Sequence, residues 1–160
     1  MRAAVLSIST SRASGQGTDA SGPKLADLAQ SLGAEVAAVE LLADDRELLE
    51  ERLRHWADVG GCELILTTGG TGFAPSDVTP EASAAVIERP APGIAEAMRE
   101  ASRAHTRHWM LSRAIAGIRG RTLIINFPGS PASIEQAGAA IAAALPHAVE
   151  LLTRGEGSHT

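Results

Sequence analysis

The most constraining feature of this chain is a regular alternation of short apolar runs with longer segments in which apolar residues recur at helical spacing. The strand-like runs cover residues 3–8, 35–42, 64–68 and 122–127. The helical segments begin near Gly22, Asp44, Thr79, Gly93 and Ser130. Such alternation favours βαβ units. The sequence therefore predicts an α/β fold, a three-layer αβα sandwich with a mostly parallel central sheet.

Three parts of the chain fit this alternation less clearly. The polar stretch 9–19 is interpreted as a loop, and residues 109–111 as a short strand. Pro146 is expected to kink or restart the last helix, because proline has no backbone N–H to donate.

Composition predicts one domain over residues 1–154, followed by a flexible tail over residues 155–160. The chain has 160 residues, of which 44% are hydrophobic, enough to bury a core. Its net charge of −5 argues against general nucleic-acid binding, which needs a basic surface, but not against a single nucleotide. The single cysteine cannot form an internal disulfide, and no apolar run approaches the length of a membrane span. We therefore expect a cytoplasmic protein that binds neither nucleic acid nor membrane.

Polar or glycine-rich loops follow each of the predicted strands. They cover residues 9–19, 43–45, 69–77 and 128–130. In an open α/β sheet, ligands bind beyond the carboxyl ends of the strands, and parallel strands share this edge. The sequence therefore predicts one composite binding site built from these loops.

The loop after the third predicted strand is typical of a phosphate site. Its small residues, which let backbone N–H groups approach a phosphate closely, are Gly69, Gly70, Thr71 and Gly72. It lacks the Gly-Lys-Ser/Thr of a P-loop and the spacing of a dinucleotide-binding fingerprint. A tight strand-to-helix connection is therefore the alternative interpretation of this turn.

Two acidic residues are candidates for holding a metal ion beside that turn. We expect Thr79 to cap the following helix, with Pro80 in its first turn, which leaves Asp77 free to face the loop. Asp44 begins a capping-box-like pattern with Glu47, so helix capping is its alternative role, as a solvated turn position is for Asp77. Two carboxylates beside a nucleotide require a divalent ion between them and the phosphates.

Two further segments carry groups suited to an anionic ligand. Asn126-Phe127-Pro128-Gly129-Ser130-Pro131 places a glycine and a helix start directly after a strand, where backbone N–H groups and the helix dipole favour an anion. A well-capped connection is the alternative. Lys24 and Arg113, the latter beside Ser112, are candidate cations, although surface lysines and arginines are commonly only solvated.

Taken in order, these motifs resemble the molybdenum-cofactor biosynthesis family that includes MogA, MoaB and the G domain of gephyrin. The segments that carry the resemblance are 67–72, 77–82, 111–113 and 126–131, together with Pro92-Gly93 and 116–120. The similarity covers essentially the whole chain. It implies a MogA/MoaB-like fold and a molybdopterin adenylyltransferase, which transfers AMP from MgATP to molybdopterin and releases pyrophosphate.

The resemblance also implies roles for particular residues. The family's two important carboxylates match Asp44 and Asp77, which it assigns to Mg²⁺ and catalysis. The glycine-rich turn fits the nucleotide. The residues that fit the pterin and its phosphate are Ser112, Arg113, Asn126, Pro128, Gly129 and Ser130.

Further implications concern assembly and the departures from the family. Members are typically homotrimers that pass their product to a separate molybdate-inserting enzyme. This chain has Ser76 where many relatives have a basic residue, which removes a possible phosphate contact, and Phe127 where they often have Leu or Met. Two other functions stay open: a non-catalytic, trimeric molybdopterin carrier, and a different nucleotide-pyrophosphate enzyme on the same fold.

Overall fold

A six-stranded sheet forms the centre of the protein in a computed structural model that describes residues 1–154. The strand order is β2-β1-β3-β6-β5-β4. The bounds are β1 (Arg2–Ile8), β2 (Glu35–Leu42), β3 (Leu64–Thr68), β4 (Arg89–Pro90), β5 (Ala116–Arg119) and β6 (Thr122–Phe127). The first four neighbours in that order, β2, β1, β3 and β6, are parallel, whereas β5 and β4 are antiparallel additions at one side. The predicted mostly parallel sheet is therefore confirmed.

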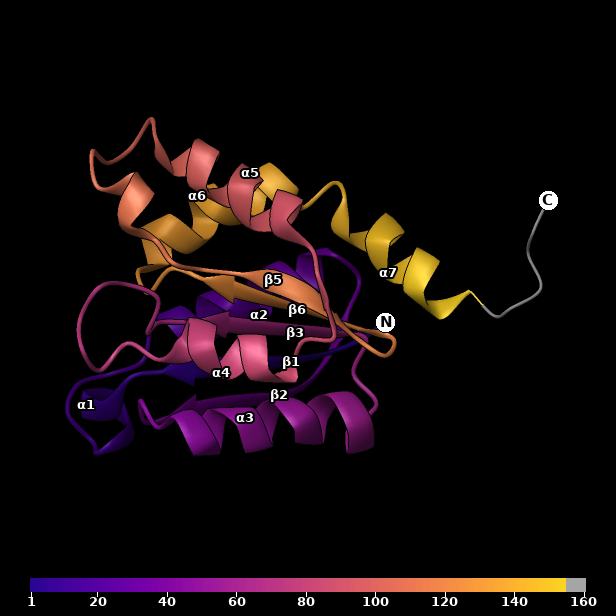
Figure 1. Cartoon of the computed structure of the whole chain (residues 1–160), viewed down its shortest axis with the longest axis horizontal. Helices are drawn as coiled ribbons and strands as arrows, with labels where there is room; N and C mark the ends of the chain where they lie inside the picture. Colours follow the sequence, from indigo (N-terminus) through magenta and orange to yellow (C-terminus); the bar gives the residue numbers. More distant parts are fainter. Residues whose placement is uncertain (155–160) are drawn as a thin grey trace.

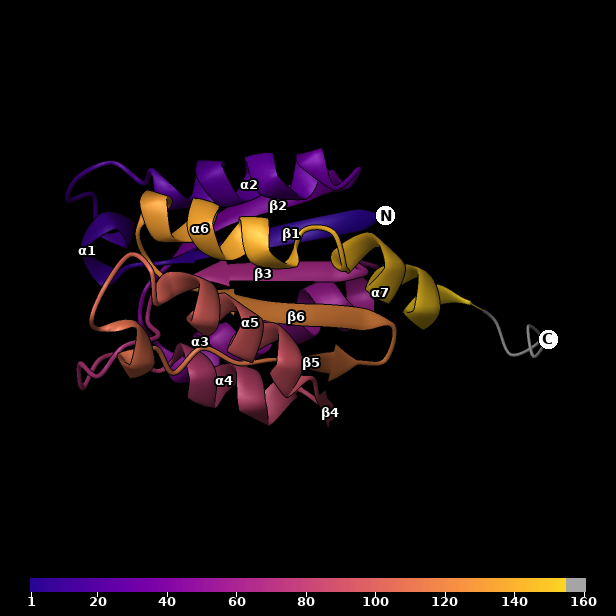
Figure 2. The ribbon, with the colours of Figure 1, turned by 90° about the horizontal axis from the view of Figure 1, so that it is seen from above.

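Helices cover both faces of this sheet and complete the predicted three-layer sandwich (Figure 1). The α-helices are α1 (Thr10–Ala13), α2 (Ser21–Ser31), α3 (Arg46–Arg54), α4 (Thr79–Val86), α5 (Pro92–Ser102), α6 (Pro131–Ile141) and α7 (Leu145–Thr153). In Figure 1, α3 and α4 lie below the sheet and α5 and α6 above it. Seen from above, α2 lies beside α6 on that upper face (Figure 2).

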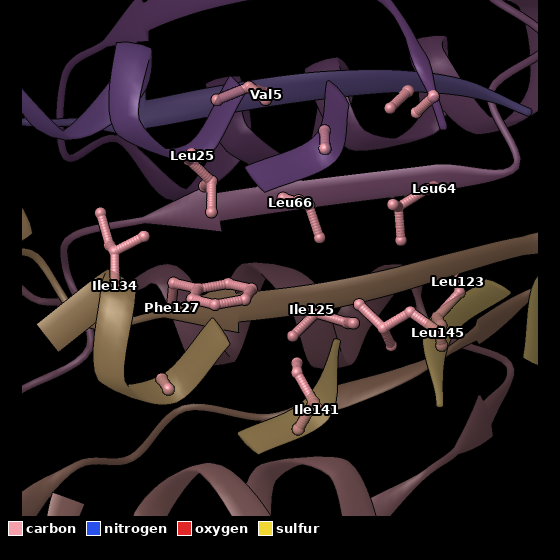
Figure 3. Close-up of a cluster of buried hydrophobic side chains, with 14 of the residues drawn as sticks. Val5, Leu25, Leu64, Leu66, Leu123, Ile125, Phe127, Ile134, Ile141 and Leu145 are labelled. Carbon is pink, nitrogen blue, oxygen red and sulfur yellow. The ribbon is translucent and has the colours of Figure 1, made fainter. Parts of the chain in front are cut away.

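The core is divided by the sheet because alternate residues of a strand face opposite sides. Val5, Leu66 and Phe127 pack against Leu25 of α2 and Ile134 of α6 on one face (Figure 3). On the other face, Leu6 and Ile65 of the same strands pack against three helical segments. The residues that these segments contribute are Leu53 of α3, Trp56 of the helical turn after α3, and Val86 of α4. These strands are buried on both sides, as the near-continuous apolar runs predict.

The structure differs from the sequence-based prediction in several segments. Residues 109–111 form a short 3₁₀ helix, η2 (Trp109–Leu111), and the predicted strand there is wrong. The stretch expected as a loop after β1 contains α1, which Ser9 caps by accepting from Arg12 N. Strands β4 and β5 were not expected from the sequence. Pro146 does mark a restart, because α7 begins at Leu145 with this proline in its first turn.

A break in regular α-helix follows α3. The five residues of η1 (His55–Val59) form a π-helical turn.

No helix within residues 1–154 has the length and apolar character required to span a membrane. The predicted tail, residues 155–160, lies outside the described residues.

Candidate functional site

The loops that follow the four parallel strands come together at one edge of the sheet, on the left in Figure 1. The Thr68 hydroxyl donates to the Pro128 carbonyl over 2.7 Å, which joins the end of β3 to the loop after β6. Ser21, at the start of α2, donates to the Gly129 carbonyl over 2.6 Å. Ser9 N donates to Leu42 O over 2.8 Å and joins the loops after β1 and β2. These bonds show that the loops share one edge.

The turn after β3 requires glycine at two consecutive positions. Gly69 and Gly70 have φ angles of +94° and +66°, a region that disfavours residues with a Cβ. A Cβ on Gly69 would also collide with the carbonyl oxygen of Ile8, and one on Gly70 with the hydroxyl of Thr79. An ordinary tight connection, the alternative interpretation, does not require the backbone to lie so close to both Ile8 and Thr79.

The carbonyl oxygens of this turn are all bonded to donors within the protein. Gly69 O accepts from the Thr79 hydroxyl at 2.9 Å, and Gly70 O accepts from Thr79 N at 3.2 Å. Arg113 binds the next two: its backbone N donates to Thr71 O at 2.8 Å and its Nε to Gly72 O at 2.7 Å. The turn is therefore fixed by residues from α4 and from the segment before β5.

The amides of the same turn consequently face the other way. In a trans peptide the C=O of one residue and the N–H of the next point in opposite directions, and none of the peptide bonds among the described residues is cis. The N–H groups concerned belong to Gly70, Thr71, Gly72 and Phe73, and within residues 1–154 none of the four donates to a protein acceptor. Successive unbonded amides after left-handed residues form a concave site for an anion.

The two predicted carboxylates flank this turn. Asp44 lies beside Gly70, with its Oδ1 3.1 Å from the position that a Cβ on that glycine would occupy. Asp77 lies beside Gly72, with its Oδ2 2.9 Å from the corresponding position. The glycines thus let both carboxylates approach the backbone, and the predicted grouping of these residues is present.

Each carboxylate is oriented by a nearby backbone N–H group, Asp44 from the loop after β1 and Asp77 from its own turn. Asp44 Oδ2 accepts from both the backbone N and the hydroxyl of Thr10, at 3.2 and 2.9 Å. Asp77 Oδ2 accepts from Ala74 N at 3.0 Å. Asp44 Oδ1 and Asp77 Oδ1 have no hydrogen-bond donor within the described residues, so each aspartate keeps one oxygen for a ligand.

The capping assignments made from the sequence need correction. Asp45, one residue after the predicted position, caps α3 by accepting from Leu48 N at 3.2 Å, so capping is not the role of Asp44. Helix α4 has Val78 at its N-cap position, without a side-chain cap, because the Thr79 hydroxyl binds the Gly69 carbonyl instead. Asp77 does not cap this helix either: its Oδ2 closes the 74–77 turn, and its Oδ1 has no donor within the described residues.

Asn126 was predicted to contact the ligand, but the structure turns its side chain into the protein interior. Its side chain is completely buried. Its Nδ2 donates to the hydroxyls of Thr67 and Ser83, at 3.0 and 2.9 Å, and its Oδ1 accepts from Ile115 N at 3.2 Å. Asn126 therefore joins β6 to β3, α4 and the segment before β5 beneath the site.

Some of the remaining predicted residues surround a small cavity of about 130 Å³ between α5, η2 and the start of α6. Ser112 and Pro128 both line it, which brings together the two segments that the resemblance assigns to the pterin. Other residues of its wall were not predicted: they include Arg99, His108, Trp109 and Ser133. Trp109 is half-buried, and the Arg103 guanidinium lies 5.8 Å from its ring centroid. The sequence feature that could have predicted this wall is Trp109, three residues before Ser112.

Ser130 and the candidate cations already have partners within the protein. Ser130 caps α6 by accepting from Ser133 N at 3.2 Å. Lys24 pairs with Glu135 at 3.2 Å. Arg113 also donates from Nη2 to Asp77 O over 2.8 Å and from Nη1 to Glu81, which lies in the 77–82 segment but was not predicted to belong to the site. The Arg113 guanidinium lowers the pKa of the Glu81 carboxyl.

Comparison with known proteins identifies one family. A model described as "probable molybdopterin binding domain" matches residues 4–147. Molybdopterin adenylyltransferase of Helicobacter pylori is 44% identical over 113 residues, which cover 71% of this chain and 64% of that protein. Molybdenum cofactor synthesis protein cinnamon of Drosophila melanogaster is 40% identical over 84% of this chain. The match spans only 22% of the length of cinnamon.

The fold is shared with solved structures of similarly named proteins. The molybdopterin biosynthesis enzyme MoaB of Thermus thermophilus superposes with a TM-score of 0.89 and is 42% identical. That superposition covers 95% of this chain and 96% of the other.

Proposed function

This chain belongs to the family of molybdopterin-binding domains, and from that premise we propose that it is a molybdopterin adenylyltransferase of molybdenum cofactor biosynthesis. The proposed reaction transfers AMP from MgATP to the terminal phosphate of molybdopterin. Relatives named for this activity are 38–44% identical to the chain and support the assignment. The observation that carries it is the turn after β3, in which consecutive free amides lie between two carboxylates.

The chemistry suits a site built to position phosphates. An oxygen of the terminal phosphate of molybdopterin attacks the α-phosphorus of ATP, and the bond from that phosphorus to the bridging oxygen of the β-phosphate breaks. Pyrophosphate leaves with the electron pair. In-line phosphoryl chemistry of this kind needs little covalent help from the protein, so orientation and charge stabilisation dominate. The amides of Gly70 to Phe73 can stabilise negative charge without reorganising.

The residues present fit a magnesium ion that arrives with its nucleotide. No group of three or more His, Cys, Asp or Glu within residues 1–154 forms a metal site of its own. Asp44 and Asp77 would hold the ion, each through the oxygen that has no protein donor, and phosphate oxygens and water would complete its coordination. When bound, Mg²⁺ would neutralise charge on the triphosphate.

We assign the pterin to the side of the site formed by Ser112 and by the loop after β6. The cavity of about 130 Å³ between them combines apolar walls with a few polar groups, as sites for flat heterocycles commonly do. Ser130 would contribute through the start of α6, which it caps, whereas Arg113 binds the carbonyl oxygens of the turn after β3 and would contribute to the nucleotide side. Gly129 adjoins Gly69, so the pterin side and the nucleotide side meet at the two turns.

The decisive experiment is incubation of the protein with molybdopterin and ATP labelled at the α-phosphate. Formation of labelled, adenylylated molybdopterin with equivalent release of pyrophosphate supports the proposal. Pyrophosphate release without molybdopterin would favour a different nucleotide-pyrophosphate enzyme.

A molybdopterin carrier is the second candidate, because the matching family is described by molybdopterin binding and not by catalysis. Retention of both Asp44 and Asp77 favours the enzyme. Isothermal titration separates the two: a carrier binds molybdopterin but not MgATP, whereas the transferase binds both.

The assembly and location of the protein are also proposals. We propose a cytoplasmic homotrimer that passes its product to a molybdate-inserting enzyme. Sedimentation equilibrium of the full chain tests the trimer, and a monomeric mass would contradict it.

A further inference from the structure

Glu81 and Arg113 form an ion pair that no step of the proposed reaction uses. Arg113 also binds the backbone of the site. Arg113 donates to three carbonyl oxygens around the turn, those of Thr71, Gly72 and Asp77, through its backbone N, its Nε and its Nη2. Its remaining named contact is Nη1 to Glu81 Oε1. The guanidinium is therefore bonded on the side of the turn opposite to the free amides.

We infer that Arg113 and Glu81 are positioning residues for phosphate binding, an inference that rests on the proposed function. Arg113 binds the carbonyl oxygens of the turn, and Glu81 holds Arg113 in the orientation in which its fork reaches them. Because each of these carbonyls is tied back, the N–H group of the next residue faces the ligand. Arg113 thus acts on the phosphate through the backbone and not as a direct cation.

The fork geometry explains why arginine is required here. Nε and Nη2 lie in one rigid plane and reach Gly72 O and Asp77 O at the same time, at 2.7 and 2.8 Å. A lysine ammonium in the same place could reach only one of these oxygens in good geometry. Loss of either bond would leave one end of the 72–77 loop unfixed, including the peptide that follows Asp77.

Only one oxygen of Glu81 takes part in the ion pair with Arg113. Its Oε2 is buried without a hydrogen-bond partner within residues 1–154. A buried, unbonded carboxylate oxygen costs free energy. An arginine at the opposite edge of the sheet provides the contrast, because Arg119 binds both oxygens of Asp58, at 2.9 and 2.8 Å, and also Val86 O.

The first test observes the turn itself, without any ligand. Arg113→Lys keeps the charge and removes the fork, and Glu81→Ala removes the holder of Arg113. Both variants should shift the amide ¹H–¹⁵N resonances of residues 70–73 in the free protein. Arg119→Lys is the matched control, since it alters an equivalent multidentate arginine far from the turn. Unchanged resonances in both Arg113→Lys and Glu81→Ala would overturn the inference, whatever the protein's activity.

The second test asks whether replacing Glu81 weakens or strengthens the binding of MgATP. The Kd for MgATP, measured by calorimetry, should rise by about tenfold in Glu81→Ala, a usual cost of removing a group that orients a ligand-binding one. Glu81→Gln keeps an acceptor for Arg113 and should restore most of the affinity. If Arg113 were instead a direct phosphate contact held back by Glu81, both variants would bind MgATP more tightly, because a negative charge has been removed near an anion.

The two tests also separate this inference from the proposed function. A wild-type protein that binds no MgATP would contradict the transferase, while the resonance shifts would still decide whether the pair positions the turn. Tighter MgATP binding in Glu81→Ala would overturn the inference and leave the transferase intact. Thermal unfolding of each variant, compared with Arg119→Lys, identifies any loss that comes from folding.

Discussion

The turn after β3 and the turn after β6 lie side by side at the edge of the same sheet, yet they are built differently. Both have carbonyl oxygens bonded by hydroxyl groups: Thr79 binds Gly69 O, and Thr68 and Ser21 bind Pro128 O and Gly129 O. Only the turn after β3 adds left-handed glycines, flanking carboxylates and an ion pair. Under the proposed function, the charged turn takes the nucleotide with its metal ion and the uncharged turn takes the pterin.

The largest expected effect comes from removing one carboxylate of the charged turn. Asp77→Asn should lower kcat for adenylylation by roughly 10²–10³-fold, the scale of losing one preorganised electrostatic group. Asparagine retains an acceptor for Ala74 N, so the fold of the loop should persist. Steady-state kinetics measures the loss, and calorimetry should show molybdopterin binding largely preserved. Turnover equal to wild type would refute the metal role.

A pair of glycine substitutions tests the difference in backbone conformation. Gly70→Ala should destabilise the protein by about 1–3 kcal/mol and abolish MgATP binding, because φ is +66° and the new Cβ meets Thr79 and Asp44. Gly129→Ala should cost less than about 0.5 kcal/mol, since the nearest atom to its Cβ is Gly69 Cα at 3.5 Å. Urea unfolding compares the two variants. Equal costs would show that the turns are not distinct in this respect.

A smaller effect is expected from loosening the uncharged turn. Thr68→Val keeps the shape of a buried side chain and removes the donor to Pro128 O, which should cost about 1 kcal/mol of unfolding free energy. The Kd for molybdopterin should rise, while the Kd for MgATP should change little. A larger change for MgATP than for molybdopterin would reverse our assignment of the two sides.

The smallest expected effect is a pH dependence confined to the charged turn. The pKa of Glu81 lies below its usual value of 4.5 in the folded protein, chiefly because Arg113 donates to it. A lowered folded-state pKa contributes stability that is present above the unfolded pKa and lost as the pH falls through the folded one. The side chain is 39% exposed, so solvent weakens the effect.

The measurement compares wild type with Glu81→Gln by urea unfolding at several pH values. The advantage of wild type over the variant should be constant well above pH 4.5 and should shrink below it. Thr68→Val should show the pH dependence of wild type, since it leaves the ion pair in place. A difference between wild type and Glu81→Gln that grows with acidity would contradict the assigned sign.

The layered fold was predictable because the strand-like runs are long, apolar and regularly spaced. Strand β5 was not, since it has only four residues and includes Gly117. A Cβ on Gly117 would meet Ile87 and the Arg89 carbonyl, so the glycine permits the close approach of β4. The segment 109–111 is too short for periodicity to distinguish a strand from a 3₁₀ turn.

At the site, sequence patterns identified the residues but not their partners. Thr79 has the properties of a helix cap, yet its hydroxyl binds Gly69 O across the turn, a tertiary contact that capping rules do not contain. Asn126 adjoins the ligand-side loop, but every residue of β6 is buried, so strand alternation gave no sign that its amide points inward. Glu81 lies within the 77–82 segment that carries the family resemblance, but that pattern does not reveal its contact with Arg113.

A site whose proposed donors are main-chain N–H groups has an uneven tolerance to mutation. Phe73 presents an amide, which every residue except proline also provides, and its side chain is exposed, so this position is free to vary with little effect on the anion. Vulnerability is concentrated instead in the residues that bend the chain or bind its carbonyl oxygens, which are Gly69, Gly70, Thr79 and Arg113. Drift at this edge of the sheet should therefore change the appearance of the loop long before it changes its ability to bind phosphate.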